Sequence, residues 1–364
     1  MAYGLINADT HNDSQGGVLA PISSVMRNRI INGSMTVDQR NAGASASFSS
    51  TFTYFLDRWN AVKQTGSAGT IQQSSTAPVG FVNSLVATNN ATGASPSAGD
   101  ANRIQTRIEG YNIADLNFGT ANAKTFTLSF WVQSSVTGTY AVSFNNSAFD
   151  RSYVATYSIP VANTWTQVSV TVAGDTSGTW LTTNGIGLSV SFGLGCGSNY
   201  NTTAGAWGAG NYIGTSACVN WTATNSATFY ITGVQLEKGV SATGYEYRQY
   251  QQELALCQRY AFVTTGSTSN SAYPALGSGN IQSAANARIY VKHPVDMRAN
   301  PTTTLNGTVT ISCDTDRAST AIGVAYTGLS SSMLGFTISS GTVGNGATAY
   351  VNGSNNYVLF SAEL

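Results

Sequence analysis

The chain has 364 residues, of which only 9% are charged, and its 16 basic residues balance its 16 acidic ones. That charge content lies far below the roughly 25% usual for soluble domains. A chain without net charge lacks the basic face on which nucleic-acid binding depends, so nucleic acid is not an expected partner. Hydrophobic residues make up 42% of the chain, enough for packed cores, which argues against disorder throughout.

The composition also predicts an all-β fold with polar, uncharged surfaces. Glu and Lys are scarce, whereas Thr, Val and the aromatic residues are plentiful beside 38 glycines. No run of about 20 apolar residues offers a membrane span, so no membrane insertion is expected. Residues 1–20 lack the basic and then apolar order of a signal peptide, which predicts synthesis in a cytosol.

Residues 1–28 read as an extended N-terminal arm. They contain Gly16, Gly17 and Pro21 among scattered polar residues, without any period. Such arms are usually disordered termini. The alternative, which the low charge favours, is an anchoring segment that becomes ordered when it docks on a partner protein.

Residues 29–247 are predicted to form a jelly-roll β-sandwich. Several runs alternate apolar and polar side chains, the pattern of antiparallel sheets with one buried face. Glycine, Asn and Ser turns separate the runs, as in sandwiches and jelly rolls. The clearest examples are Thr125–Gln133, Tyr140–Phe144, Val168–Val172, Leu188–Leu194 and Phe229–Leu236.

A short connecting helix is predicted over residues 248–263. Tyr250, Leu254, Cys257 and Ala261 follow one another at spacings of four, three and four, so they share one helical face. We expect this face to form the contact between subunits of an oligomer. Residues 264–364 then form a second, smaller C-terminal β-sandwich, with strand-like runs at Ala287–Val291 and Tyr357–Phe360.

Nothing in the chain has the spacing of a metal site, a catalytic triad or a cofactor site, so no metal, catalytic residue or cofactor is predicted. The chain has four cysteines and two histidines, without a Cys-x-x-Cys pair or a His cluster. Cys196 and Cys218 bracket one Gly-rich segment, and whether they form a disulfide is left open. Cys257 is expected to act as a small core residue.

Four sets of segments occur in an order that points to a family. They are Arg29–Met35 with Asp38–Arg40 and Tyr54–Trp59; Phe229–Gly239; Glu253–Tyr260; and His293–Thr302 with Phe360–Leu364. Together they resemble a widespread group of bacteriophage virion proteins that includes tail fibres, tail-tip proteins and head appendages. The first two sets look like the opening and closing parts of a carbohydrate-binding-module-like jelly roll.

The resemblance implies a structural or adhesive component of a virion, commonly a homotrimer, made in the cytoplasm of a host bacterium. The expected function is a tail-fibre or tail-tip adhesin whose arm anchors it to another virion protein, with head decoration or a head fibre as the alternative. The same motifs also have a purely structural interpretation. Asn32-Gly33 is a turn signal, and Asp57-Arg58-Trp59 is consistent with an ion pair beside a buried indole.

Host-surface polysaccharide is the expected ligand of the loops between residues 193 and 222. Aromatic rings stack on the apolar faces of sugars, while Asn amides bind hydroxyl groups. Packing of the same rings onto the sandwich or onto another subunit is the competing interpretation. The candidate ligand-binding residues are Tyr200, Trp207, Tyr212 and Trp221, with Asn199, Asn201 and Asn211 between them.

The chain is not expected to be an enzyme. A polysaccharide depolymerase is the alternative, because glycoside hydrolysis requires two carboxyl groups within about 5–9.5 Å of each other. Asp314 and Asp316 are the one pair spaced for this role. Such a pair is more often a turn cap or a weak calcium site.

Overall fold

The computed structural model describes residues 26–48, 50–66, 68–91, 93–266, 274–353 and 355–364, and the backbone of two short strands before them. These strands, β1 (His11–Asn12) and β2 (Val18–Leu19), pair antiparallel. The prediction of an extended, anchoring arm over residues 1–28 falls almost entirely outside the described residues.

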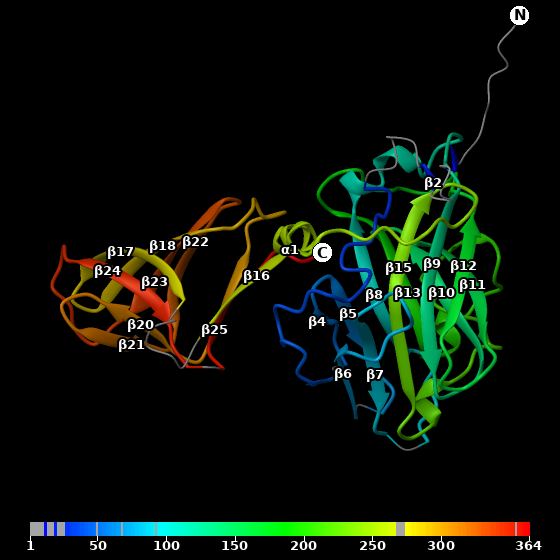
Figure 1. Ribbon diagram of the computed structural model, residues 1–364, viewed down its shortest axis with the longest axis horizontal. Helices are drawn as coiled ribbons and strands as arrows, with labels where there is room; N and C mark the ends of the chain where they lie inside the picture. The colour runs from blue at the N-terminus through cyan, green and yellow to red at the C-terminus, as the bar shows by residue number, and fades with distance from the viewer. Residues whose placement is uncertain are drawn as a thin grey trace, which may run out of the picture.

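The first domain is a sandwich of two antiparallel sheets (Figure 1). In spatial order, the seven-stranded sheet contains β14 (Trp207–Ala209), β11 (Arg151–Ile159), β10 (Gly138–Asn145), β13 (Ile186–Cys196), β8 (Ala101–Glu109), β5 (Trp59–Val62) and β4 (Thr53–Leu56). The six-stranded sheet contains β12 (Thr166–Val172), β9 (Phe126–Ser134), β15 (Thr228–Lys238), β7 (Ser84–Asn89), β6 (Gly69–Ser74) and β3 (Ala46–Ser47).

The alternating side chains form the core between these two sheets. Phe130 of β9 and Phe192 of β13 are buried and meet edge to face with ring centroids 5.0 Å apart. Such a pair contributes beyond the area that it buries. The predicted jelly-roll sandwich is confirmed, and its alternation leaves the outward faces of both sheets polar.

The second domain is the smaller β-sandwich that was expected. Its three-stranded sheet contains β16 (Ala261–Thr265), β25 (Tyr357–Ser361) and β19 (Thr302–Asn306). Its seven-stranded sheet contains β21 (Asp316–Ser319), β20 (Val309–Ser312), β24 (Gly346–Val351), β17 (Ala275–Ser283), β18 (Asn286–Lys292), β23 (Ser331–Thr337) and β22 (Ile322–Thr327). Both sheets contribute to one core, with Phe360 and Ile289 fully buried in it.

A single α-helix, α1 (Tyr250–Gln258), lies between the two domains in the described part of the chain. It is shorter than the predicted span of 248–263, because Ala261 and Phe262 already belong to β16. Ala261 pairs there with Ser361, so its side chain takes the orientation that the sheet sets and does not belong to a helical face.

The two domains are joined by buried side chains, which we call the junction. Cys257 and Tyr260 pack against Ile31 and Val37 of the first domain and are fully buried. The Arg259 guanidinium donates to both carboxylate oxygens of Glu109 at 3.0 and 2.6 Å, and the Tyr260 hydroxyl donates to the same carboxylate at 2.6 Å. Buried charges require such paired geometry.

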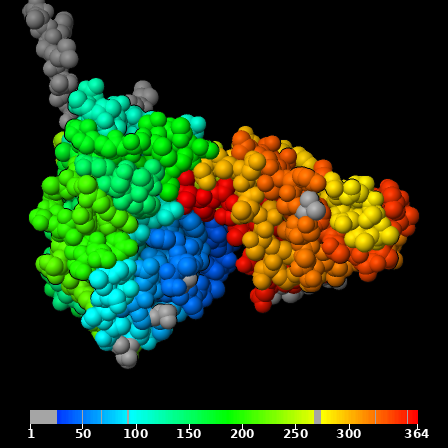
Figure 2. Space-filling model, turned by 180° about the vertical axis from the view of Figure 1, so that it is seen from behind, coloured from blue at the N-terminus to red at the C-terminus, as the bar shows by residue number. Residues whose placement is uncertain are grey.

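The chain end completes the junction. Glu363 accepts ion pairs from Arg58 and Arg40, while the Arg58 guanidinium lies 3.6 Å from the centre of the Tyr260 ring. Arg298 donates to the main-chain oxygens of Ala362 and Glu363 at 2.7 and 3.0 Å. Figure 2 shows this terminal segment, in red, in the waist between the domains. Residues from most of the segments that carried the resemblance therefore meet in the junction, where their role is to join the domains.

Candidate functional site

The outward face of the seven-stranded sheet carries a row of polar side chains. On β8, Ile104 and Ile108 point into the core, so the alternate residues Arg103, Gln105 and Arg107 point outward. The neighbouring strands continue this polar face, since Gln105 donates to the Ser191 hydroxyl on β13 at 2.8 Å. The face is thus polar, although it is largely buried beneath loops.

A cavity of about 230 Å³ opens on this face, and we call it the sheet-face cleft. It lies between the end of β5, strand β8 and the loops on either side of them. Its lining combines aromatic, amide and arginine side chains: Phe52, Val62, Gln64, Ala101, Arg103, Arg107, Phe149, Tyr200 and Asn211. No acidic residue occurs in this lining among the residues that the structure describes.

Arg103 is the unusual member of the cleft. Only 5% of the residue is exposed, and its Nε atom has no hydrogen-bond partner. Within the described residues its guanidinium makes no ion pair and contacts the Phe52 ring, 4.7 Å from the ring centre. Burial and the nearby Arg107 lower the pKa of Arg103 to about 10, so it stays charged at neutral pH.

Arg107 brings a second positive charge to the same cleft. Its guanidinium lies 5.3 Å from the centre of the Phe52 ring and 5.8 Å from that of Phe149. It donates to the side chain of Gln105 at 3.1 Å and to the main-chain oxygen of Leu364. The junction therefore reaches the rim of the cleft and holds one of its two arginines in place.

Phe149 reaches the cleft from the turn between β10 and β11. Its φ of 55° lies in the left-handed region, which bulky residues rarely adopt. Asn146 holds the turn, since its side-chain oxygen accepts from the main-chain N–H groups of Asp150 and Arg151, both at 3.2 Å. Such a conformation persists only where the surrounding structure maintains it, so the turn holds Phe149 in a defined position.

This lining can hold a sugar residue. Phe52, Phe149 and Tyr200 offer ring faces, and Phe52 is 42% exposed. The Gln64 and Asn211 amides can both donate to and accept from hydroxyl groups, whereas the guanidinium groups only donate. The volume is below the roughly 300–1,000 Å³ of drug-sized pockets, which fits one unit of a longer glycan.

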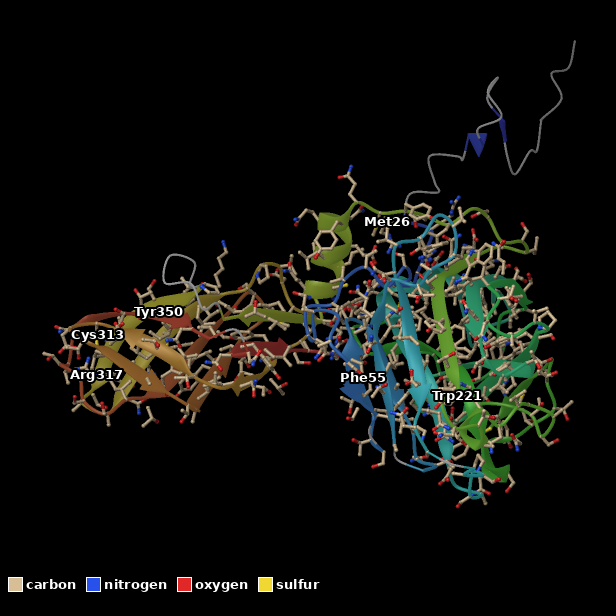
Figure 3. All side chains as sticks on the ribbon, turned by 60° about the horizontal axis from the view of Figure 1, so that its bottom comes forward. Met26, Phe55, Trp221, Cys313, Arg317 and Tyr350 are labelled. Carbon is tan, nitrogen blue, oxygen red and sulfur yellow. The ribbon has the colours of Figure 1, made fainter. Side chains whose placement is uncertain are left out.

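The four aromatic residues that were predicted to bind glycan lie in different places, and one of them lines the sheet-face cleft. Tyr200 lines the cleft, as does Asn211. Trp221 is fully buried in the sandwich core and has no surface to offer a ligand (Figure 3). The remaining two are half-buried: Trp207 packs against Trp180 and donates to the Ala173 oxygen at 2.7 Å, and Tyr212 does not line the cleft.

The pair Asp314 and Asp316 lies at the far end of the C-terminal domain, beside the labelled Cys313, Arg317 and Tyr350 of Figure 3. Each carboxylate has its own partner. Arg317 binds Asp314 and lowers its pKa, while the Tyr350 hydroxyl donates to Asp316 at 2.7 Å and lowers the pKa of that group. Both groups are thus held in the ionised form, so neither is prepared as a general acid.

The residues predicted for a subunit contact lie in different environments. Cys257 and Ala261 are fully buried within the chain itself, because the junction covers them. Leu254 is half-buried against the same cluster, and Tyr250 is 55% exposed. The subunit contact stays a prediction, and in a single folded chain only Leu254 and Tyr250 of the four have surface to contribute.

Two further findings concern other classes of site. Within the described ranges, no group of three or more His, Cys, Asp or Glu side chains could hold a metal ion, and no helix is long and apolar enough to cross a membrane. Cys196 and Cys218 are free and half-buried. Burial raises the pKa of Cys196 to about 11, which makes its thiolate scarce at neutral pH.

No protein-family model matches this chain, and the comparison with curated proteins gave no match. Among solved structures, it is similar to the enzymatically active domain of tailspike protein 4 from bacteriophage CBA120, at 15% identity and a TM-score of 0.31 over 58% of this chain. The match spans only 22% of that tailspike chain.

Two carbohydrate-binding modules are also similar. The CBM22-1 xylan-binding domain from Paenibacillus barcinonensis is 11% identical, with a TM-score of 0.28 over 56% of this chain and 99% of that one. The family 11 module from Clostridium thermocellum, solved with a mixed-linked tetrasaccharide, is 11% identical, with a TM-score of 0.29 over 56% of this chain and 100% of that one. These are partial likenesses, so the glycan-binding role proposed below rests on the sheet-face cleft itself.

Proposed function

We propose that this chain is a non-enzymatic structural component of a bacteriophage virion appendage, and that its sheet-face cleft binds host-surface glycan. The observation that carries the binding role is the cleft itself, where three aromatic rings and four hydrogen-bonding side chains converge on one face of a rigid sheet. Strand β8 fixes Arg103 and Arg107 in this face, while the rings and amides reach the cleft from the flanking loops.

The virion role rests on the ordered segments that resemble phage appendage proteins. Their residues fill the junction, which explains why such segments would accompany this two-domain arrangement whatever glycan is bound. A tail fibre or tail tip is the favoured position, and head decoration is the second candidate. Under this proposal the N-terminal arm attaches the chain to another virion protein.

Binding without cleavage is part of the proposal. It is supported by the lowered pKa values of Asp314 and Asp316 and by the lack of an acidic side chain in the described lining of the cleft. Incubation of the chain with host polysaccharide should release no new reducing ends. Their appearance, and their loss in the Asp314→Asn variant, would support a depolymerase instead.

The glycan role is tested with the purified full chain and intact host cells. We expect the labelled chain to bind the cells, and isolated surface polysaccharide to compete with it. The double variant Phe52→Ala and Tyr200→Ala should fold normally, because both side chains lie at the rim, and should lose binding. Trp207→Phe is the matched control outside the cleft. Equal binding by the wild type and the double variant would contradict the proposal.

A further inference from the structure

The charge of the sheet-face cleft is not needed to bind a neutral sugar. The Gln64 and Asn211 amides can bind the hydroxyl groups of such a sugar, and the aromatic rings can stack on its apolar faces. Uncharged side chains bind it at a lower desolvation cost than arginines do. Arg103 instead brings a full positive charge to a site where 5% of the residue is exposed. A buried charge is normally paired.

The part of the chain that the structure describes does not supply that partner. Nε of Arg103 is without a hydrogen bond, as are those of Arg58 and Arg248, but within the described residues no carboxylate pairs with the Arg103 guanidinium. Other buried arginines of this chain are paired: Arg58 with Glu363, and Arg248 with Glu253 at 3.3 Å. Arg107, the second arginine of the cleft, adds like charge and lowers the pKa of Arg103.

We infer that the sheet-face cleft selects acidic glycans, and that a sugar carboxylate completes the ion pair which Arg103 lacks. This inference rests on the proposed glycan binding and names the class of glycan. The planar guanidinium presents its donors in a fork that matches a carboxylate. The Phe52 ring, whose centre lies 4.7 Å from the guanidinium, packs against it and holds the fork in position.

The test uses the full chain and an array of matched oligosaccharide pairs. In each pair, one member carries a glucuronate, galacturonate or sialate carboxyl group, and the other is the same oligosaccharide after carboxyl reduction. We expect binding to the acidic members and at least about tenfold weaker binding to their reduced partners. This factor corresponds to the loss of one charge-assisted hydrogen-bonded pair.

Three variants assign the effect to Arg103. Arg103→Gln should lose the preference for acidic members while keeping or raising the melting temperature, because it removes an unpaired buried charge. Arg103→Lys should keep part of the preference. Arg288→Gln is the matched control, since Arg288 also lies over an aromatic ring, 5.3 Å from the centre of Tyr326, beside a cavity of about 330 Å³ in the C-terminal domain.

The outcomes separate the two proposals. Equal binding to both members of each pair, or an unchanged acid preference in Arg103→Gln, would overturn the inference and leave glycan binding intact. A preference that disappears in Arg288→Gln would also overturn it, because the site would then lie in the other domain. Binding to no glycan on the array or on host cells would contradict the proposed function as well.

Discussion

At the scale of single residues, the first domain keeps several ionisable groups away from water and treats them differently. Arg58 has a carboxylate partner, Glu109 accepts from two side chains, and Arg103 has no such partner among the described residues. Asp57 is a fourth case, since its buried carboxylate accepts from the main-chain and side-chain nitrogens of Gln39, both at 2.7 Å. These differences lead to separate predictions for stability and for binding.

The contribution of Asp57 to the free energy of unfolding should fall between about pH 4 and pH 6. Burial raises its pKa from 3.8 to about 6, with the Arg40 charge acting in the opposite direction. Because the folded state binds this proton more tightly than the unfolded state, the contribution is full below pH 4 and is lost as pH rises through 6. The expected loss is about 3 kcal/mol.

The measurement is urea unfolding of the wild type and Asp57→Asn at several values between pH 4 and pH 7. The other carboxyl groups titrate in both proteins, so the difference between the two curves isolates Asp57. Wild-type stability should fall relative to the variant as pH rises. Parallel curves would show that Asp57 titrates as an exposed carboxyl group does.

Trp221 and Tyr200 should respond to substitution in opposite ways. Trp221→Ala removes a fully buried ring from the core and should cost about 3–5 kcal/mol of unfolding free energy. Tyr200→Ala should change stability little and weaken glycan binding, since the ring lines the cleft. Thermal unfolding and cell binding measure the two effects. A stable Trp221→Ala variant that fails to bind would place the ligand at the indole instead.

At the scale of elements, α1 and the segment after β25 together form the junction between the two domains. Glu253 of α1 accepts from the main-chain N–H of Asn32 in the first domain, while Arg298 of the C-terminal domain donates to the Asn184 oxygen at 2.8 Å. Each side of the junction therefore donates a hydrogen bond to the other. The Leu364 oxygen also accepts from Arg107 and, at 2.8 Å, from Tyr54. Because Arg107 lines the sheet-face cleft, we expect the junction to affect the position of this arginine in the cleft.

Removal of the Glu363 carboxylate tests how much the junction contributes to stability. Glu363→Ala leaves Arg58, 1% exposed, without its ion-pair partner and should cost about 3–5 kcal/mol. Asp314→Ala removes the exposed pair with Arg317 and serves as control, with little expected change. Chemical unfolding gives both values, and proteolysis should cut Glu363→Ala faster between the domains. Equal stability of the two variants would contradict the role of the junction.

At the scale of the whole molecule, two sandwiches extend from the junction, and an apolar surface lies beside it. Val82, Tyr247 and Tyr250 are 74%, 61% and 55% exposed around a cavity of about 120 Å³. The sulfur of Met26 accepts a hydrogen bond from the Gln252 amide on α1. Exposed aromatic side chains of this kind are typical of protein interfaces.

A homotrimer remains the expected assembly, with Tyr250 at or near the contact. Light scattering of the full chain should give the mass of three chains, and Tyr250→Asp should lower it by placing a charge on the apolar surface. Gln251→Asp, one residue further along α1, is the control for added charge on the same exposed helix. A monomeric wild type at high concentration would contradict this prediction.

The fold followed from the sequence because apolar residues alternate clearly in long strands, and the helix was found through its period. Its end was misplaced since Ala261 continues the helical spacing while its main chain pairs with β25. Aromatic residues in Gly-rich loops gave one residue of the cleft, Tyr200. Trp221 looked equivalent in sequence, but only tertiary packing decides which ring of a loop is buried.

Apart from Asn211, which lies in the same Gly-rich segment as Tyr200, the remaining cleft residues come from distant segments that a single sequence does not bring together. Phe52 reaches the cleft from the loop before β4, Arg103 from β8, and Phe149 from the turn between β10 and β11. One signal was present in the sequence: Arg103 and Arg107 alternate with Ile104 and Ile108 in a chain that has only 16 basic residues. In the structure this alternation places both arginines on the outer face of β8.

The most direct test of the glycan site is hydrogen–deuterium exchange of the full chain with and without saturating host-surface polysaccharide. The cleft predicts slower exchange in the 146–151 turn, in residues 198–212 and in β8 around Arg103, with the C-terminal domain unchanged. Protection confined to the strands around Arg288, or to no described segment at all, would contradict a glycan site on the seven-stranded sheet of the first domain.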